Sequence, residues 1–351
     1  MMEDEVVRRR AWLTREQFLD YLGATNLIPG PNSTELAIHI GHARAGWPGL
    51  LVAGMAFILP ATLIVGAAGW FYVRYGALPE LAGILYGIKP VAIAIVAQAL
   101  WRLGRTAVRT AGLAVLALAA TAAAAIGVHE LVVLAGAALI TAVVARALRA
   151  LRRPSSLVAF GTVVGATATV GAAAPSMAPF ALWPLFLVCA KAGAVLFGSG
   201  YVLLAFLRAD LVERLGWLTE AQLVDAIAIG QVTPGPVFTT ATFIGYLLGG
   251  PAGAAVATAG IFLPAFVFVA LSGLLVPRLR RSIVAGAVLD GVNVASLALM
   301  AVVSWHLGRA TLVDPLTIGL AAGSLIALTK WRLNSAWLIG CGAAVGWLSS
   351  G

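Results

Sequence analysis

The sequence predicts an all-α, polytopic membrane protein made of two homologous helical repeats, each interrupted by the triplet Pro-Gly-Pro (PGP). The 351 residues are 61% hydrophobic and only 11% charged, whereas a soluble domain has about 25% charged residues. Apolar stretches reach about 20 residues, the length that spans a bilayer as a helix. The same motifs also return later in the chain in a constant register.

The apolar stretches give the class of protein. Two of them are "GLLVAGMAFILPATLIVGAAGW", which begins at Gly49, and "IVAGAVLDGVNVASLALMAVVSW", which begins at Ile283. The alternation of polar and apolar residues that is typical of strands is absent. The stretches therefore predict membrane helices.

The net charge of +9 does not indicate a nucleic-acid partner. The arginines cluster between apolar stretches, as in residues 102–109, 146–153 and 278–281, which is the pattern of cytoplasmic loops under the positive-inside rule. Cys189 and Cys341 lie alone in apolar segments, so the sequence predicts no metal site, disulfide or cofactor. The bilayer is the first expected partner, and the expected location is the inner (cytoplasmic) membrane.

The repeat is visible by eye. "WLTREQFLD" at 12–20 matches "WLTEAQLVD" at 217–225, an offset of 205 residues that also places the first PGP, at 29–31, on the second, at 234–236. One residue then drops out, and an offset of 204 aligns Gly46 with Gly250, "ILPA" with "FLPA", and Lys89 with Asn293.

We expect three parts: a first repeat at 1–153, a linker with an extra helix at 154–179, and a second repeat at 180–351. In the second repeat we expect helices near 181–206, 219–232, 252–275, 283–306, 312–328 and 334–350, with a short half-helix after the PGP. The counterpart of the first of these would lie before residue 1, so the first repeat lacks its first helix. We expect in-frame codons upstream of Met1 to encode it.

Each PGP triplet breaks a helix because proline lacks the N–H group and clashes with the preceding turn. Backbone groups freed in lipid need partners inside the protein. In transporters, paired breaks of this kind place half-helix N-termini around an ion at the midplane. We therefore expect the two breaks to lie close together near mid-membrane and to bind an anion, although a single break alone is also compatible with a plain proline kink. The residues concerned are Pro29, Gly30, Pro31, Asn32, Ser33, Thr34, Gln231, Pro234, Gly235, Pro236, Thr239 and Thr240.

The hydroxyl and amide residues after each break have two interpretations. They cap the half-helices, or they donate hydrogen bonds to a bound oxyanion.

Charged residues at membrane depth are the second signal, because they are costly there and are functional candidates by default. Lys89 and Lys191 both lie inside apolar runs, and the alternative for each is a side chain that reaches the interface. Glu35 would repel an anion unless it is protonated, so it is either a proton-coupling residue or the partner of an arginine. His39 is expected to be a packed or interfacial residue rather than a ligand.

At these residues the sequence resembles the chromate ion transporter family. The motifs that carry the resemblance are "NLIPGPNSTELAIHIG", "RAGWPG", "FILPA" and "GIKPVAIAI" in the first half, and "FGSGYV", "WLTEAQLVDAIAIGQVTPGP" and "FLPA" in the second. The resemblance implies a long-chain, two-repeat exporter of chromate with halves of opposite orientation. Gly198 and Ser199 of "FGSG" and Asn293 join the expected binding residues.

Topology leaves one alternative open. PGP elements that cross the membrane once make the repeats inverted, and re-entrant elements make them parallel. The lysines and arginines divide between the two sides in the same ratio for both, so only the resemblance favours inversion.

The expected function is the export of an oxyanion, driven by the membrane potential or a proton gradient. The alternative is a carrier for sulfate or another oxyanion, which no residue distinguishes from chromate. The sequence contains no HExxH, GxSxG or GxxxxGK[ST] motif, so neither an enzyme nor an ATP-driven pump is expected. Whether the protein forms a homodimer is open at this point.

Overall fold

The computed structural model describes residues 2–76, 78–151, 179–196, 200–233 and 235–350. These residues form helices and connecting turns, with no strand among them. Five of the described helices are long and apolar enough to cross a membrane: Asn32–Tyr75, Leu81–Ala107, Glu130–Ala150, Val237–Ser272 and Val284–Thr311. The prediction of an all-α polytopic membrane protein is confirmed. The extra helix expected near 157–174 lies outside the described residues.

The first half contains five α-helices after a short helical segment at Asp4–Arg9. They are α1 (Arg15–Thr25), α2 (Asn32–Tyr75), α3 (Pro79–Ala107), α4 (Ala111–Ala125) and α5 (Glu130–Leu151).

The second half begins with α6 (Leu182–Val195), followed by short segments at Gly200–Val202, α7 (Leu203–Leu207) and Arg208–Arg214. Then come α8 (Glu220–Val232), a turn at Val237–Thr239, α9 (Thr240–Arg281), α10 (Ile283–Thr311), α11 (Pro315–Lys330) and α12 (Ser335–Ser350). From α8 onward these follow the expected ranges.

The prediction of a single helix at 181–206 is wrong, because the helix in this region is α6 and covers only Leu182–Val195. It stops at Val195, and Leu196 is already extended, with φ −73° and ψ 113°. The freed Leu196 carbonyl accepts a hydrogen bond of 2.7 Å from the Gly30 N–H of the first break. The end of α6 and the first PGP break therefore stabilise each other, because each supplies a backbone partner for the other within the protein.

Both long helices that follow a PGP bend sharply at matching positions. In α2 the bend is at Ala45 and Gly46, where Gly46 has φ 59° and ψ −142°. In α9 it is at Gly249 and Gly250, where Gly250 has φ 60° and ψ −150°. Such a positive φ favours glycine, and these two glycines are the ones that the 204-residue offset aligns.

Glycines also let the two arms of each bent helix touch. A Cβ added to Gly41 would overlap the Gly49 carbonyl oxygen, and one added to Gly245 would overlap the Gly253 carbonyl oxygen. Each bend thus folds a short arm, just after the break, tightly against a long helix.

The helix before the first break also folds back on that short arm. The ring of Tyr21 in α1 stacks on His39 in α2 with centroids 5.4 Å apart, and Phe18 shares a buried cluster with Leu36 and Ile40. A chain that continued straight through the break would hold these residues far apart, since a helix rises 1.5 Å per residue. The first PGP therefore forms the tip of a helical hairpin, and His39 is the packed residue expected.

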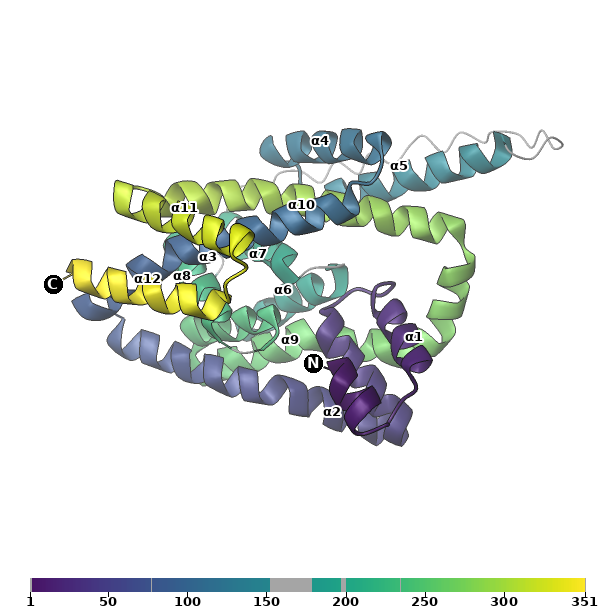
Figure 1. Cartoon of the computed structure of the whole chain (residues 1–351), viewed down its shortest axis with the longest axis horizontal. Coiled ribbons are helices and arrows are strands. Elements are labelled where there is room, and N and C mark those ends of the chain that lie inside the picture. The colour runs from purple at the N-terminus through teal and green to yellow at the C-terminus, as the bar shows by residue number, and fades with distance from the viewer. Residues whose placement is uncertain (1, 77, 152–178, 197–199, 234, 351) are drawn as a thin grey trace.

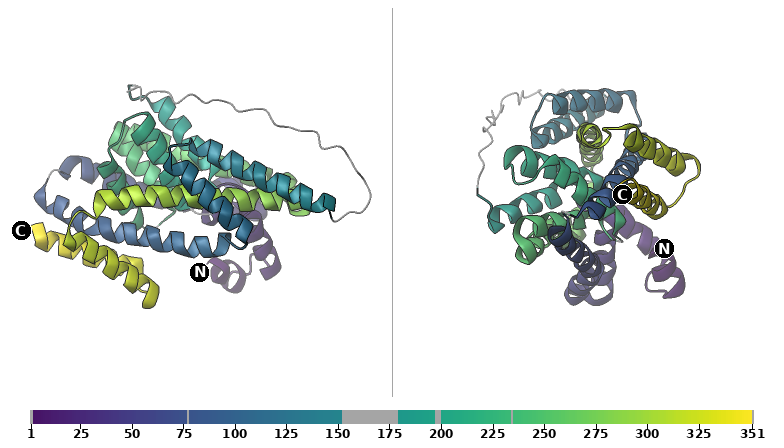
Figure 2. Two further views of the ribbon diagram at one scale, coloured as in Figure 1. Left: turned by 90° about the horizontal axis from the view of Figure 1, so that it is seen from above. Right: turned by 90° about the vertical axis from the view of Figure 1, so that its left-hand side faces the viewer.

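The two halves exchange helices. The hairpin α4–α5 of the first half packs on α10, and α11–α12 of the second half pack on α3. Figure 1 shows these pairs at opposite ends of the molecule, and Figure 2 shows the bundle from above and from one end.

Helices α2 and α9 pack in opposite directions at the centre. Gly54 lies against Phe266, and Gly69, further along α2, lies against Tyr246, earlier in α9. Residue numbers rise along one helix as they fall along the other, so the two run antiparallel.

The same helix-capping arrangement occurs at two places 205 residues apart in the chain. Thr14 and Gln17 form a capping box at the start of α1, and Thr219 and Gln222 form the same box at the start of α8. The paired side-chain and backbone bonds satisfy the free N–H groups of each helix start.

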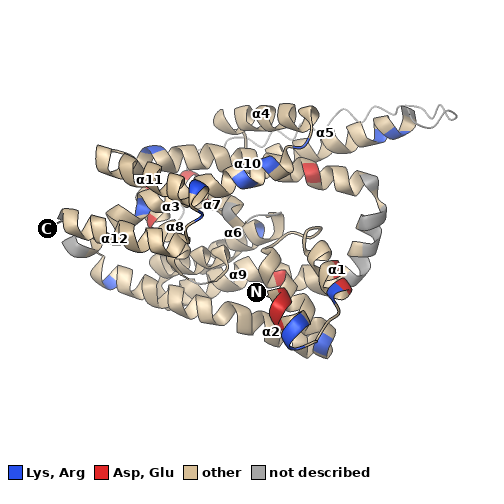
Figure 3. Ribbon diagram, viewed as in Figure 1, with Lys and Arg blue, Asp and Glu red and all other residues tan. Residues whose placement is uncertain are grey.

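Charged side chains are sparse on the long helices. Figure 3 shows most of α2 and α9 without charge, while charges gather around the N-terminal segment and the far end of α5. The few charges held inside the bundle therefore stand out.

Candidate functional site

The first break carries a buried carboxyl group at its tip. Gly30 has φ 138°, and a Cβ at Gly30 would overlap Oε1 of Glu35. The Glu35 side chain therefore folds back from the first turn of α2 over the break. It is fully buried, and neither carboxyl oxygen has a hydrogen-bond partner among the described residues. Among the described residues, no arginine forms an ion pair with Glu35.

The second break lies against the first half. Gly235 has φ 153°, and a Cβ there would overlap the Cβ of Ala61 in α2. Ala61 belongs to the "ILPA" motif. Its counterpart Ala265 in α9 shares a buried cluster with Ile28, the residue before the first PGP. Each break is thus in contact with the other half, while Pro234 itself lies outside the described residues.

The side chains that follow each break do not cap the half-helices. The N-cap of α2 is Pro31, and no side chain caps it. Thr239, the N-cap residue of α9, caps nothing with its side chain and instead donates its hydroxyl to the Pro236 carbonyl at 2.8 Å. Asn32 instead donates 2.8 Å to Asn26 Oδ1, and Ser33 is exposed.

Several polar atoms near the breaks are buried without a hydrogen-bond partner. Apart from the Glu35 carboxyl they are Asn32 Oδ1, Thr34 Oγ1, Thr62 Oγ1 and Thr240 Oγ1. Buried polar groups are nearly always paired in proteins, so such a concentration at two helix breaks favours a ligand. Gln231 lies half-buried near the end of α8, just before the second break.

Lys89 is held by an internal carboxylate. Its ammonium lies 2.9 Å from Asp225 Oδ1 in α8, and the hydroxyl of Tyr72 donates 2.8 Å to Asp225 Oδ2. The Asp225 side chain is 7% exposed and that of Lys89 25%. The ammonium is paired inside the bundle rather than extended to the interface.

Asn293, the counterpart of Lys89, lies in a different environment. It lines a cavity of about 400 Å³ together with Asn26, Arg109 and Ser296. Ser296 is 1% exposed and its hydroxyl has no described partner, whereas Arg109 is exposed. The cavity is thus lined by the exposed residues Arg109 and Asn26, and Asn26 is bonded to Asn32 of the first break.

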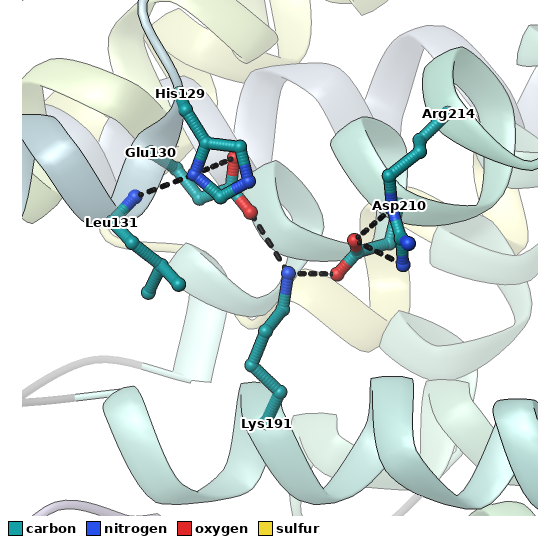
Figure 4. Close-up of polar contacts among 6 residues, drawn as sticks. All are labelled: His129, Glu130, Leu131, Lys191, Asp210 and Arg214. Carbon is teal, nitrogen blue, oxygen red and sulfur yellow. Dashed lines mark hydrogen bonds and ion pairs between the residues drawn. The ribbon is translucent and has the colours of Figure 1, made fainter. Parts of the chain in front are cut away.

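Lys191 lies in a chain of ion pairs, drawn in Figure 4. Its ammonium contacts Asp210 Oδ2 and lies 2.9 Å from Glu130 Oε1. Arg214 donates 3.0 Å to the other Asp210 oxygen, and His129 Nδ1 is 3.5 Å from Glu130 Oε2. Gly198 and Ser199, a few residues after Lys191, lie outside the described residues.

Several residues of this site carried no expectation from the sequence. They are Asn26, Thr62, Tyr72, Arg109, Glu130, Asp210, Asp225 and Ser296. Asp225 had a visible signal, because it stands before the apolar stretch "AIAIG" and an intramembrane lysine needs a counter-charge. Thr62 and Ser296 had none, since serine and threonine are common in membrane helices.

The comparisons with known proteins agree with one another. The chromate transporter family model matches residues 1–142 and 183–347. A chromate transport protein of Cupriavidus metallidurans is 33% identical over 98% of this chain and 86% of its own length. One of Pseudomonas aeruginosa is 31% identical over 99% and 86%, and a probable one of Synechococcus elongatus is 30% identical over 95% and 84%. No solved structure matches the chain. With a family model matching both halves and relatives aligned over almost the whole length, the chain belongs to the chromate transporter family.

Proposed function

We propose that this protein exports chromate across the inner membrane and holds the dianion between its two PGP breaks. The observation that carries the proposal is the set of buried, unpartnered polar atoms at the breaks of a membrane protein of this family. The binding residues proposed from the sequence are kept, with Thr62 and Asn26 added.

Glu35 acts as a neutral hydrogen-bond donor in this proposal. A carboxylate beside a dianion would repel it, and an unpaired buried charge is costly. A protonated carboxyl group removes both costs and supplies an O–H donor at the tip of the first break. The Thr34 and Thr240 hydroxyls add neutral donors from the two halves.

The cavity beside Asn293 is the proposed route of approach. Arg109 and Asn26 are both exposed and line this cavity; Arg109 attracts an anion, and Asn26 is one hydrogen bond away from Asn32. At the corresponding place in the other half, the Lys89 ammonium is paired with the Asp225 carboxylate, which also accepts a hydrogen bond from Tyr72. This asymmetry fits a carrier with one side open and the other closed.

We further propose that the halves are inverted repeats. The antiparallel packing of α2 and α9, the reciprocal exchange of helices and the matched bends support this. Re-entrant breaks require parallel repeats only if the segment 181–206 crosses the membrane as a single helix. Because α6 already ends at Val195, we propose that this segment does not cross as a single helix, and hairpin breaks are then compatible with inverted repeats.

The direction of transport follows from charge. A potential of 100 mV, inside negative, contributes about 2.3 kcal/mol per elementary charge, so about 4.6 kcal/mol for the exit of a dianion. Uptake would need more than two accompanying cations to gain from the same potential. Sulfate remains the second candidate substrate, because none of the donors at the breaks distinguishes two tetrahedral dianions.

The test is the uptake of labelled chromate into inverted membrane vesicles, whose lumen becomes positive on energisation. We expect uptake that valinomycin with potassium abolishes; loss with nigericin instead would assign the driving force to the proton gradient. Unlabelled sulfate at equal concentration should compete less than chromate does. Uptake confined to right-side-out vesicles would contradict export, and stronger competition by sulfate would make sulfate the substrate.

A further inference from the structure

The ion-pair chain around Lys191 joins five ionisable side chains from three parts of the fold. His129 precedes α5, Glu130 begins it, Lys191 lies in α6, and Asp210 and Arg214 lie in the segment after α7. Figure 4 shows the Lys191 ammonium between the two carboxylates. Cys189, two residues before Lys191, is a further titratable group beside Asp210.

The two carboxylates are the most buried members of the chain, whereas the Lys191 side chain between them is 25% exposed. The side chains of His129 and Arg214 are 37% and 51% exposed, whereas those of Glu130 and Asp210 are 7% and 2% exposed. Two carboxylates, one lysine, one arginine and a neutral histidine sum to zero charge. Asp210 is already neutralised by Arg214, so Glu130 is the carboxylate whose charge depends on Lys191.

His129 has two alternative hydrogen bonds. Its Nδ1 accepts 3.2 Å from the Leu131 N–H, which requires that this nitrogen carry no proton. The same atom lies 3.5 Å from Glu130 Oε2. A proton on Nδ1 would exchange the first contact for an ion pair with Glu130, so His129 is placed to pass a proton from the surface to the buried carboxyl group.

We propose that Glu130 is a proton-binding residue of the transport cycle, and that its protonation releases Lys191 to hold an oxyanion. When a dianion takes Lys191, Glu130 loses its cation in a buried site, where an unpaired carboxylate is unfavourable. It therefore takes up one proton, which arrives through His129. Anion binding and proton binding then strengthen each other by the same factor. This inference rests on the proposed function, because Lys191 would hold the same oxyanion that we propose the protein exports.

The experiment measures chromate affinity against pH for the full-length protein in lipid nanodiscs, with proton uptake recorded in weak buffer. For the wild type we expect one extra proton bound per anion, and an affinity that falls by up to about tenfold per pH unit as pH rises. The chromate affinity of Glu130→Gln should lose the part of its pH dependence that comes from this proton. The variant should take up no extra proton when chromate binds. Protonation of chromate itself contributes equally to every variant, so the difference in slope reports Glu130.

Glu213→Gln is the matched control, because Glu213 is a carboxylate paired with Arg208 in a neighbouring network; it should keep the wild-type slope. Glu130→Asp keeps a carboxyl group and should also keep the slope, which guards against a variant that fails to fold. An unchanged slope and proton uptake in folded Glu130→Gln would overturn the inference while leaving chromate transport intact. Absence of chromate and sulfate binding by the wild type would instead overturn the proposed function, and this inference with it.

Discussion

The Lys89 ammonium lies 2.9 Å from the Asp225 carboxylate and so joins α3 of the first half to α8 of the second. Both groups are largely inside the bundle, where a charge without its partner would be costly. Asp225 therefore occupies the position beside Lys89 that an anion would take if the proposed function is correct.

Lys89→Ala should lower chromate resistance in cells far more than Arg309→Ala, because Arg309 is exposed near the end of α10. Loss of one charge-assisted contact to the anion corresponds to about tenfold slower transport. Growth in chromate at matched expression measures the effect. The double variant Lys89→Ala/Asp225→Ala separates the roles: full recovery of resistance would mean that Lys89 only balances Asp225.

Tyr72→Phe should lower the free energy of unfolding by about 1–3 kcal/mol, because Asp225 Oδ2 loses the 2.8 Å bond that Tyr72 donates. The thermal midpoint in detergent reports this loss. Tyr75→Phe, on the same helix and exposed, is the control. Equal midpoints for the two variants would show that the bond contributes nothing.

Gly235→Ala should abolish most transport. The added methyl group would overlap Ala61, and a φ of 153° costs a non-glycine residue about 1–3 kcal/mol. Gly286→Ala in α10 is the control, since nothing lies within 4 Å of its Cβ position. Vesicle uptake normalised to folded protein is the measurement, and wild-type uptake by Gly235→Ala would refute a role for the second break.

Glu35→Gln should keep chromate affinity within about twofold, because an amide N–H replaces the carboxyl O–H as donor. Glu35→Ala should weaken binding by about tenfold, the value of one hydrogen bond of about 1.4 kcal/mol. Isothermal titration of the purified variants checks both. If glutamine costs as much as alanine, Glu35 does not act as a neutral donor.

The halves should work as separate chains. Helices α2, α3 and α10 make their main contacts across the halves, and packing of this kind drives helix association in lipid. Residues 1–153 and 154–351 expressed together should restore chromate resistance, and neither should do so alone. Resistance from one half by itself would mean that the exchanged helices are dispensable.

The helices could be predicted from the sequence because membrane segments are read from uninterrupted hydrophobicity. The repeat register even aligned the glycines of the two bends, Gly46 and Gly250. The bend itself could not be foreseen, since glycine is common in straight membrane helices as well.

The candidate site was predictable only in part. The PGP triplets and the two lysines inside apolar runs, Lys89 and Lys191, were visible as residues that break the apolar pattern. Their partners were not, because Lys89 and Asp225 are brought together by tertiary packing between the halves rather than by local spacing. The end of α6 at Val195 was missed for the same reason: the backbone partner that makes it stable, Gly30, is far away in the sequence.

The glycine contacts beside each bend limit how the protein can move. Since the short arm and the long helix touch backbone to backbone at Gly41 and Gly49, and again at Gly245 and Gly253, the arms cannot slide past one another. We therefore expect each bent helix to move as one rigid body. The Gly30–Leu196 hydrogen bond joins the first PGP triplet to the end of α6, and a bond of this kind contributes only about 0.5–1.5 kcal/mol. Such a bond can be broken and formed again without a large cost in free energy.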